Sequence, residues 1–178
     1  AHVDGRPELL VTNHEFETHS LFRNDGKESF SDASVEAGIA SPTLPYVGFG
    51  VAFFDGDNDA NLDLAIVNGH VIDNTTIFGP GSSHAQRRLL FQNTTGRRFT
   101  EMSKQAGPGF ATPAVGRTLI SGDIDNDGDV DLVITNNGGP LEVLRNNAGR
   151  ERHALVVRVA VVRSNRDGIR ARVTITAQ

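Results

Sequence analysis

The sequence contains two acidic stretches with the same spacing, Asp55-Gly-Asp57-Asn-Asp59-Ala-Asn61-Leu-Asp63 and Asp123-Ile-Asp125-Asn-Asp127-Gly-Asp129-Val-Asp131. We call them the first and the second acidic loop. Carboxylates stand at positions 1, 3, 5 and 9 of each. Calcium takes about six to eight oxygen ligands at roughly 2.3–2.6 Å, and a tight loop supplies them from alternate side chains, a backbone carbonyl and a late acid. The spacing therefore predicts two Ca²⁺ sites per chain. The expected ligands are Asp55, Asp57, Asp59, Asp63 and the Asn61 carbonyl in one site, and Asp123, Asp125, Asp127, Asp131 and the Asp129 carbonyl in the other.

The residues around each loop predict strands. Apolar segments follow directly at Leu64–Val67 and Leu132–Thr135, and Val51–Phe54 precedes the first loop. β-Branched and aromatic residues of this kind favour strands. An EF-hand would need a helix on either side and a Glu at position 12, where this chain has Ile66 and Ile134. Each acidic loop is therefore expected to join two strands.

A turn without a metal is the alternative for each loop. Asp, Asn and Gly favour turns because their side chains bond to nearby backbone and because they tolerate left-handed conformations. Two copies in the same phase, followed by the same apolar segment, favour the metal site. Four carboxylates within a few ångströms would also repel one another without a cation.

A longer unit repeats around the acidic loops. The segment Leu21-Phe22-Arg-Asn24 recurs as Leu90-Phe91-Gln-Asn93 at an offset of 69 residues, and the acidic loops are offset by 68. A third, partial copy covers Val133 to Gly149. The first residues, Asp4 to Asn13, resemble the end of an acidic loop and the strand after it, so Asp4 and Glu8 form an incomplete metal site in this interpretation.

Repeats of short strands with Gly, Asn and Asp turns are typical of β-propeller blades. We therefore expect an all-β fold with about two and a half blades of antiparallel strands: a partial blade at 1–46, a blade at 47–115 and a partial blade at 116–150. Helical periodicity is absent, and only 34–37 and 103–106 are expected to form single helical turns. Residues 73–87 should form a surface loop. Open blade edges would allow self-association, because an unpaired strand edge is a template for pairing.

Charge is distributed unevenly. Residues 1–144 carry 9 basic and 20 acidic side chains, and residues 145–178 carry 8 Arg and 2 acids, which together give the net charge of −5. Two bound dications would bring this total to about −1, so much of the acidity is interpreted as ligand charge. The chain has no Cys, which excludes a disulfide framework. Nothing in the sequence resembles a signal peptide or a membrane span.

The motif Phe49-Gly50 with Ala52, together with the two acidic loops, resembles the FG-GAP or VCBS repeat, the blade of integrin alpha-chain heads and of many bacterial secreted proteins. Residues 165–173 resemble the signature of the ASPIC/UnbV domain, so 151–178 is interpreted as the start of such a domain, folded as a β-hairpin. This resemblance implies a calcium-dependent interaction or adhesion module that is extracellular, at the cell surface or periplasmic, and that is not an enzyme. Ala60 departs from the family, which has Gly there. If that position requires a positive φ, the first loop is strained by about 1 kcal/mol.

Partner recognition is expected on a loop rim formed by 73–87 and 14–20, with a protein or a glycan as ligand. The alternatives are a carbohydrate-binding module and a propeller scaffold of a secreted hydrolase or lyase. The pair His14 and His19 could suggest a metal or hydrolytic site, but a spacing of five does not match the helical zinc motif. His70 could line the same rim. Nucleic acid is not expected as a partner, because the larger part of the chain is acidic and stacking aromatics are missing from the basic tail.

Overall fold

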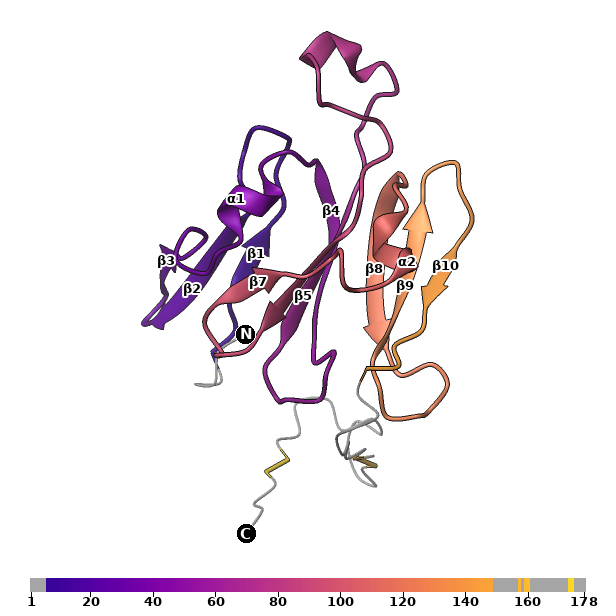
Figure 1. Cartoon of the computed structure of the whole chain (residues 1–178). Helices are drawn as coiled ribbons and strands as arrows, with labels where there is room; N and C mark the ends of the chain where they lie inside the picture. The colour runs from indigo at the N-terminus through magenta and orange to yellow at the C-terminus, as the bar shows by residue number, and fades with distance from the viewer. Residues whose placement is uncertain (1–5, 149–156, 158, 161–172, 175–178) are drawn as a thin grey trace.

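The protein is described from a computed structural model in which residues 6–148, 157, 159–160 and 173–174 are placed. Three antiparallel sheets lie side by side and follow one another in chain order (Figure 1). The predicted all-β fold of propeller-type blades is confirmed. Asp4 and the predicted C-terminal hairpin lie outside the described residues. No helix in the described part of the chain is both long and apolar enough to cross a membrane.

Each sheet is made from consecutive strands. The first holds β1 (Leu9–Val11), β2 (Ser20–Gly26) and β3 (Ser29–Asp32); the second holds β4 (Gly48–Phe54), β5 (Asp63–Asn68), β6 (Leu89–Asn93) and β7 (Phe99–Glu101); the third holds β8 (Gly116–Gly122), β9 (Asp131–Asn136) and β10 (Glu142–Leu144). The repeat places β2 in the role of β6, and β8 in the role of β4. The division of the chain into domains stays a prediction.

Short helices stand where the sequence did not predict them. They are α1 (Ala40–Thr43), the 3₁₀ helix η1 (Thr75–Phe78) and α2 (Pro108–Ala111). Residues 34–37 and 103–106 form single turns, as expected, and neither extends into a helix. Gly38 and Gly107 have φ angles of 81° and 85°, which end each turn. A short helix follows soon after each glycine. The helix α2 begins at Pro108, whose fixed φ suits the first helical position.

The strand β5 is the centre of the core, because both of its faces are covered. All six of its residues are buried. Leu64 and Ile66 pack towards the first sheet with Leu21 and Phe91. Ala65 and Val67 pack towards the third sheet with a cluster that includes Phe110, Leu119, Leu132 and Ile134. Burying a Leu or Ile side chain stabilises the fold by about 1.5–3 kcal/mol, so the central sheet is held from both sides.

The motif Phe49-Gly50 lies at a close approach between the second and third sheets. A Cβ atom on Gly50 would overlap the backbone nitrogen of Leu119 in β8 and lie 2.8 Å from the Thr118 carbonyl carbon. The Arg117 guanidinium lies over the Phe49 ring, 4.0 Å from its centroid. The glycine thus permits two strands to approach, and the aromatic ring beside it carries a cation–π contact between the sheets.

Candidate metal centres

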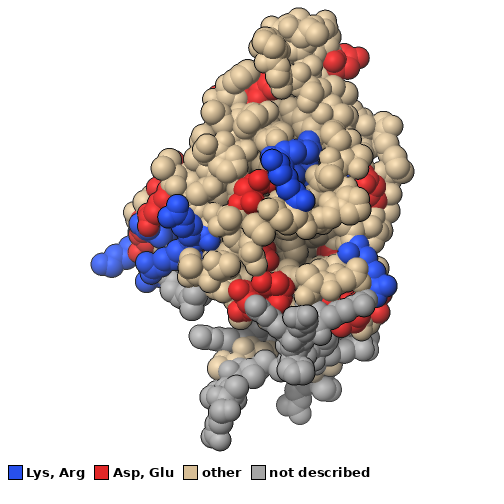
Figure 2. All heavy atoms as spheres, viewed as in Figure 1, with Lys and Arg blue, Asp and Glu red and all other residues tan. Residues whose placement is uncertain are grey.

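The two acidic loops lie at the same end of the molecule, the lower end in Figure 1. Each joins two antiparallel strands, and the strand pairing closes at Phe54 with Asp63 in one and at Gly122 with Asp131 in the other. The predicted strand–loop–strand arrangement is therefore confirmed for both. Acidic side chains gather at this end in the space-filling view (Figure 2).

The two loops share one hydrogen-bond pattern. The carboxylate at position 1 accepts the backbone N–H groups of positions 5 and 6, the carboxylate at position 5 accepts that of position 7, and the carboxylate at position 9 accepts that of position 2. In the first loop the donors and acceptors are Asp59 N to Asp55 Oδ1 (3.0 Å), Ala60 N to Asp55 Oδ2 (2.8 Å), Asn61 N to Asp59 Oδ1 (2.8 Å) and Gly56 N to Asp63 Oδ2 (3.2 Å). In the second they are Asp127 N to Asp123 Oδ1 (3.2 Å), Gly128 N to Asp123 Oδ2 (3.1 Å), Asp129 N to Asp127 Oδ1 (3.1 Å) and Ile124 N to Asp131 Oδ2 (3.0 Å).

The backbone is left-handed at positions 4 and 6 of both loops. The φ angles are 56° at Asn58, 67° at Ala60, 60° at Asn126 and 91° at Gly128. Asn tolerates this conformation and Gly adopts it freely, but Ala does not. The requirement for a positive φ at Ala60 is thus confirmed, and the first loop carries backbone strain that the second lacks.

The last carboxylate of each loop is buried and accepts a backbone N–H from the end of the third strand of its sheet or from the residues just after it. Asp63 is 5% exposed and Asp131 is 1% exposed. Asp63 Oδ1 accepts the backbone N–H of Asn93 at 2.8 Å, and Asp131 Oδ1 accepts that of Asn146 at 2.8 Å. Burial raises the pKa of the Asp63 carboxyl to about 6 against the two backbone donors that lower it, and the nearby Asp57 and Asp59 charges add to the rise. A bound cation would favour the ionised form.

The predicted ligands are only partly brought together. Oxygens of Asp55, Asp57 and Asp59 lie within 4.8 Å of one another, as do oxygens of Asp123, Asp125 and Asp131. Two ligands on one calcium ion lie at most about 4.6–5.2 Å apart, so these spacings and the all-oxygen donor set fit the ion. Asp63 and Asp127 are not members of these groups. The carbonyl ligands at Asn61 and Asp129, and the site at Asp4 and Glu8, stay predictions.

A polar side chain at the end of the third strand of the second sheet, and one directly after the third strand of the third sheet, each reach the acidic loop of the same sheet. Gln92 Nε2 donates to Asp57 Oδ2 at 3.0 Å. At the corresponding position of the repeat, Arg145 places Nε 2.6 Å from Asp125 Oδ2 and Nη2 3.1 Å from Asp127 Oδ2. The Asp129 N–H and the Arg145 guanidinium hold the pKa of the Asp127 carboxyl below its usual value. Sequence reasoning missed both residues, although each directly precedes the repeated Asn.

One hydrogen bond joins the two loops directly, and a second joins the first loop to Asn146, which follows β10. Asn58 Nδ2 donates to Asp129 Oδ1 at 2.9 Å, and Asn146 Nδ2 donates to the Gly56 carbonyl at 2.7 Å. Asp129 is 3% exposed, and its Oδ2 atom has no hydrogen-bond partner among the described residues. The position-7 side chain of the second loop therefore faces the first loop, a role that the sequence analysis did not assign.

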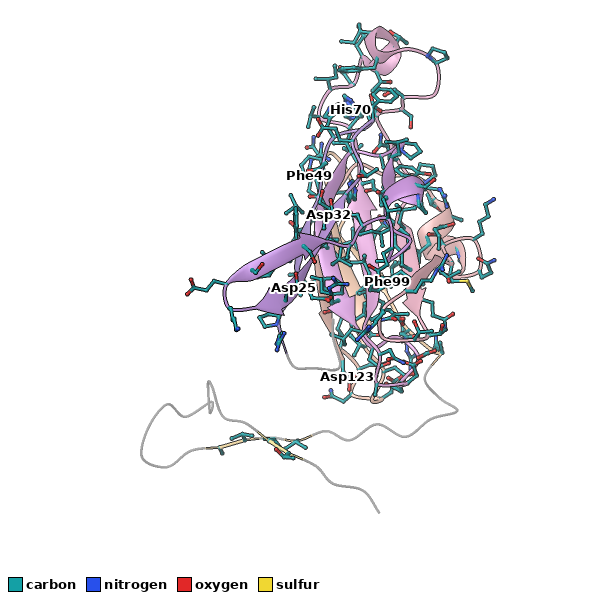
Figure 3. The ribbon with its side chains drawn as sticks, turned by 90° about the vertical axis from the view of Figure 1, so that its left-hand side faces the viewer. Asp25, Asp32, Phe49, His70, Phe99 and Asp123 are labelled. Carbon is teal, nitrogen blue, oxygen red and sulfur yellow. The ribbon has the colours of Figure 1, made fainter. Side chains whose placement is uncertain are left out.

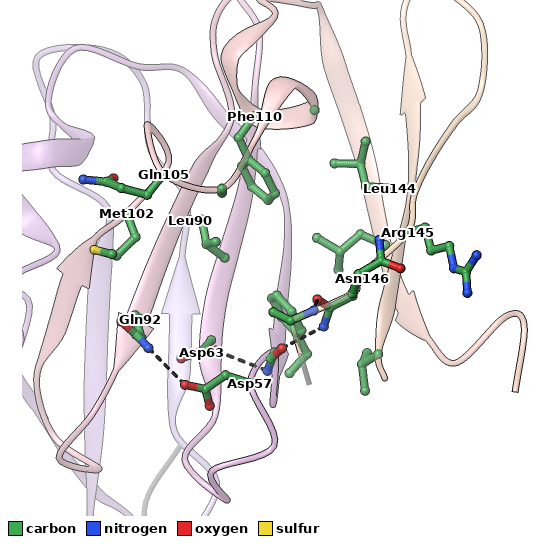
Figure 4. A pocket seen from close by; sticks show the side chains of 18 of the residues that line it. Asp57, Asp63, Leu90, Gln92, Met102, Gln105, Phe110, Leu144, Arg145 and Asn146 are labelled. Carbon is green, nitrogen blue, oxygen red and sulfur yellow. Dashed lines mark hydrogen bonds between the residues drawn. The ribbon is translucent and has the colours of Figure 1, made fainter. Parts of the chain in front are cut away.

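A cavity of about 610 Å³ opens between the second and third sheets beside the acidic loops (Figure 4). Leu90, Phe110 and Leu144 form its apolar walls, and Asp57 and Gln92 lie at its polar edge. Such a cavity has the size of a small-molecule site.

The predicted rim at the other end brings His14 together with partners other than His19. His14, Glu15 and His70 have ligand atoms within 4.8 Å of one another. His19 is buried against Gly48, and its Nδ1 accepts the Asn13 N–H at 3.2 Å. The interpretation of His14 and His19 as a pair is therefore not supported by the geometry.

Comparison with known proteins shows similarity to cartilage acidic protein 1 from several vertebrates. The chain is 32% identical to human cartilage acidic protein 1 over 117 residues, which are 65% of this chain and 15% of that protein. It is 30% identical to the Xenopus tropicalis protein of the same name over 137 residues, which are 75% of this chain and 18% of that protein. The chain thus spans less than a fifth of these relatives. The ASPIC/UnbV signature at 165–173 stays a prediction. Residues 3–66, with Phe49-Gly50 and the first acidic loop, match the family model of the FG-GAP-like repeat.

Proposed function

We propose that this chain is a calcium-binding, non-enzymatic interaction module of the FG-GAP type that works outside the cell, at the cell surface or in the periplasm. The observation that carries the proposal is the shared geometry of the two acidic loops. Both position a group of three carboxylates within 4.8 Å on the same backbone hydrogen-bond pattern. The FG-GAP-like match over residues 3–66 and the similarity to cartilage acidic protein 1 support the extracellular setting.

Asp55, Asp57 and Asp59 would hold one ion, and Asp123, Asp125 and Asp131 the other, with Asp63 and Asp127 as further candidate ligands. Calcium would supply the positive charge that offsets repulsion within each group. The backbone donors hold the carboxylates in position, and the last Asp of each loop is bonded to the backbone at Asn93 in β6 or at Asn146 just after β10. Ion binding would therefore stabilise the sheet as well as the loop, so metal binding and folding are coupled.

The proposal is tested by calcium titration calorimetry on the chelator-stripped chain, with thermal unfolding in parallel. We expect two ions per chain for the wild type and one for Asp125→Asn. Asp73→Asn is the matched control, because Asp73 is exposed and lies outside both loops; it should bind two. Absence of binding in the wild type would leave the loops as metal-free turns, and equal binding by Asp125→Asn would remove that residue from the site.

The cavity beside the first loop favours carbohydrate binding as a second candidate function. Its apolar walls and the polar groups of Gln92 and Asp57 resemble the usual construction of a small-ligand site, in which a few polar groups orient a mostly apolar contact. A glycan array, repeated with Leu90→Trp to fill the cavity, would test it. Binding that Leu90→Trp abolishes supports this function; absence of binding to any glycan leaves a protein ligand as the partner.

A further inference from the structure

A second kind of ligand cluster lies far from the acidic loops. His14 and Glu15 belong to the connection between β1 and β2, and His70 follows β5. Figure 3 labels His70 near one end of the molecule and Asp123 near the other. One ligand atom from each of His14, Glu15 and His70 lies within 4.8 Å of the other two. Two sheets thus contribute to a single group of two imidazoles and a carboxylate.

The Glu15 carboxylate is buried with few donors. Glu15 is 3% exposed, and both of its oxygens lie 2.8 Å from the Ser82 hydroxyl. A hydroxyl has only one proton to donate, whereas an ionised carboxylate has about four acceptor sites. A buried carboxylate is costly unless it is paired or coordinates a metal. The site therefore has unused acceptor capacity on an oxygen that faces the histidines.

His70 points an unpartnered nitrogen at this carboxylate. The His70 side chain is fully buried, and its Nε2 atom has no hydrogen-bond partner among the described residues. Nε2 lies 3.6 Å from Glu15 Oε1, which is beyond an ordinary hydrogen bond. The two atoms are thus aimed at the same space without bonding directly, and that separation suits two ligands of one ion.

The other ring nitrogen of His70 contacts the Ile72 backbone, and its protonation decides whether Nε2 has a lone pair for a metal. Nδ1 lies 3.2 Å from the Ile72 carbonyl oxygen and 3.1 Å from the Ile72 N–H. When Nδ1 carries the proton it donates to the carbonyl, and Nε2 then presents a lone pair. Metal-binding histidines commonly donate their second N–H to a backbone carbonyl, which fixes the ring and its tautomer.

An aromatic ring covers the cluster. The Phe78 ring centroid lies 4.9 Å from that of His70 and 5.8 Å from that of His14. The 3₁₀ helix η1 carries Phe78, and Thr75 of the same helix donates to the Ser82 carbonyl at 3.2 Å. The loop after β5 therefore supplies one ligand, a donor to Glu15 and an apolar cover. An apolar shell restricts solvent access to a metal site.

We propose that His14, Glu15 and His70 form a binding site for Zn²⁺ or a similar transition-metal ion, separate from the calcium loops. Two imidazole nitrogens and one carboxylate oxygen suit zinc, while calcium prefers oxygen ligands alone. The site has three protein ligands and leaves a fourth position for water or for a ligand of a binding partner. The ion would connect the β1–β2 segment of the first sheet to the loop of the second.

The test is a zinc titration against a chromophoric chelator on the calcium-loaded full chain, repeated with Co²⁺, whose visible absorption reports tetrahedral coordination. We expect one equivalent of zinc, unaffected by excess calcium. His14→Ala and Glu15→Gln should each weaken binding by more than about 100-fold, since loss of an outer-shell partner alone costs up to that amount. Far-UV circular dichroism in chelator checks that both variants are folded. The near-isosteric Glu15→Gln keeps the contact with Ser82.

Two control variants locate the ion. His84→Ala removes a histidine of the same loop that is not in the cluster, and Asp125→Asn removes a carboxylate of the second acidic loop; both should bind zinc as the wild type does. Absence of a zinc equivalent in the wild type would overturn the site, as would unchanged binding by His14→Ala and Glu15→Gln. Loss of zinc binding in either control variant would show that the ion is held by other residues, and it would also overturn the assignment of the ion to His14, Glu15 and His70.

Discussion

Replacing Ala60 by Gly should stabilise the protein, although Ala→Gly usually destabilises. Ala60 has a φ of 67° and its N–H is held by Asp55 Oδ2 at 2.8 Å, so the backbone cannot relax without losing that bond. A left-handed conformation costs an L-residue roughly 1–2 kcal/mol. Glycine avoids this cost but loses about 0.4–1 kcal/mol through the greater freedom of the unfolded chain. The net gain in unfolding free energy is then between about 0 and 1.6 kcal/mol, with a central value of about 0.8 kcal/mol.

The assay is urea unfolding in excess chelator, so that strain is measured apart from metal binding. The matched control is Ala111→Gly, because Ala111 ends the short helix α2 and is exposed, and its φ is not positive. The control should lose about 0.5–1 kcal/mol of stability. The reciprocal change, Gly128→Ala, places alanine at a φ of 91° in the second loop and should destabilise by about 1 kcal/mol or more. If Ala60→Gly and Ala111→Gly both destabilise, the argument from strain is refuted.

Three further predictions concern the contacts around the sheets. Arg145→Gln should raise the calcium affinity of the second loop up to about fivefold in calorimetry, because an exposed ion pair that competes with the metal is worth at most about 1 kcal/mol. The control Arg97→Gln, at an exposed residue away from the loop, should leave the affinity unchanged. If both variants raise the affinity equally, the effect comes from net charge and not from the ion pair. Gly50→Ala should lower the unfolding free energy by about 1–3 kcal/mol through overpacking against β8, whereas Gly122→Ala, which meets nothing within 4 Å, should not lower it. Burial lowers the pKa of His19 from its usual 6.5 to about 4, so the unfolded chain binds the proton of His19 more readily and the contribution of His19 to stability should fall by about 3 kcal/mol as the pH drops from 6.5 to 4. The raised pKa of Asp63 acts in the opposite direction over this range, so the measurement is the difference between wild type and His19→Gln in urea unfolding at both pH values. An equal change in the two proteins would contradict the prediction.

The local sequence pattern was sufficient to predict the strands and the backbone conformation of the acidic loops. The continuous apolar run Leu64–Val67 predicts a strand, and β5 is buried on both faces as such runs are. The spacing of the acids places each loop between two strands, and the missing Gly at Ala60 identifies the strained position. These features depend on residues within about ten positions of one another, so a single sequence carries them.

Contacts between residues of different sheets could not be predicted from the local sequence pattern. Glu15 meets Ser82 across 67 residues, and Asn58 meets Asp129 across 71. Nothing in either segment specifies the other, because their approach depends on how neighbouring sheets twist and pack. The buried Arg88, which donates to the Gly109 carbonyl and to Glu142 of β10, was missed for the same reason. The spacing of His14 and His19 argued against a metal site there, and the residue that completes the cluster, His70, comes from the next sheet.

The hydrogen bonds that connect the two acidic loops, directly and through Asn146, have a thermodynamic consequence. Asn58 of one loop holds Asp129 of the other, and Asn146, whose N–H fixes Asp131, also holds Gly56. If an ion in one loop changes the affinity of the other through these bonds, the second ion must change the first by the same factor, since binding free energies are reciprocal. The calcium titration curve would then differ from the curve expected for two independent sites. Cutting the Asn58 bond should weaken this coupling without removing a single ligand, and the Asn146 bonds would carry what remains.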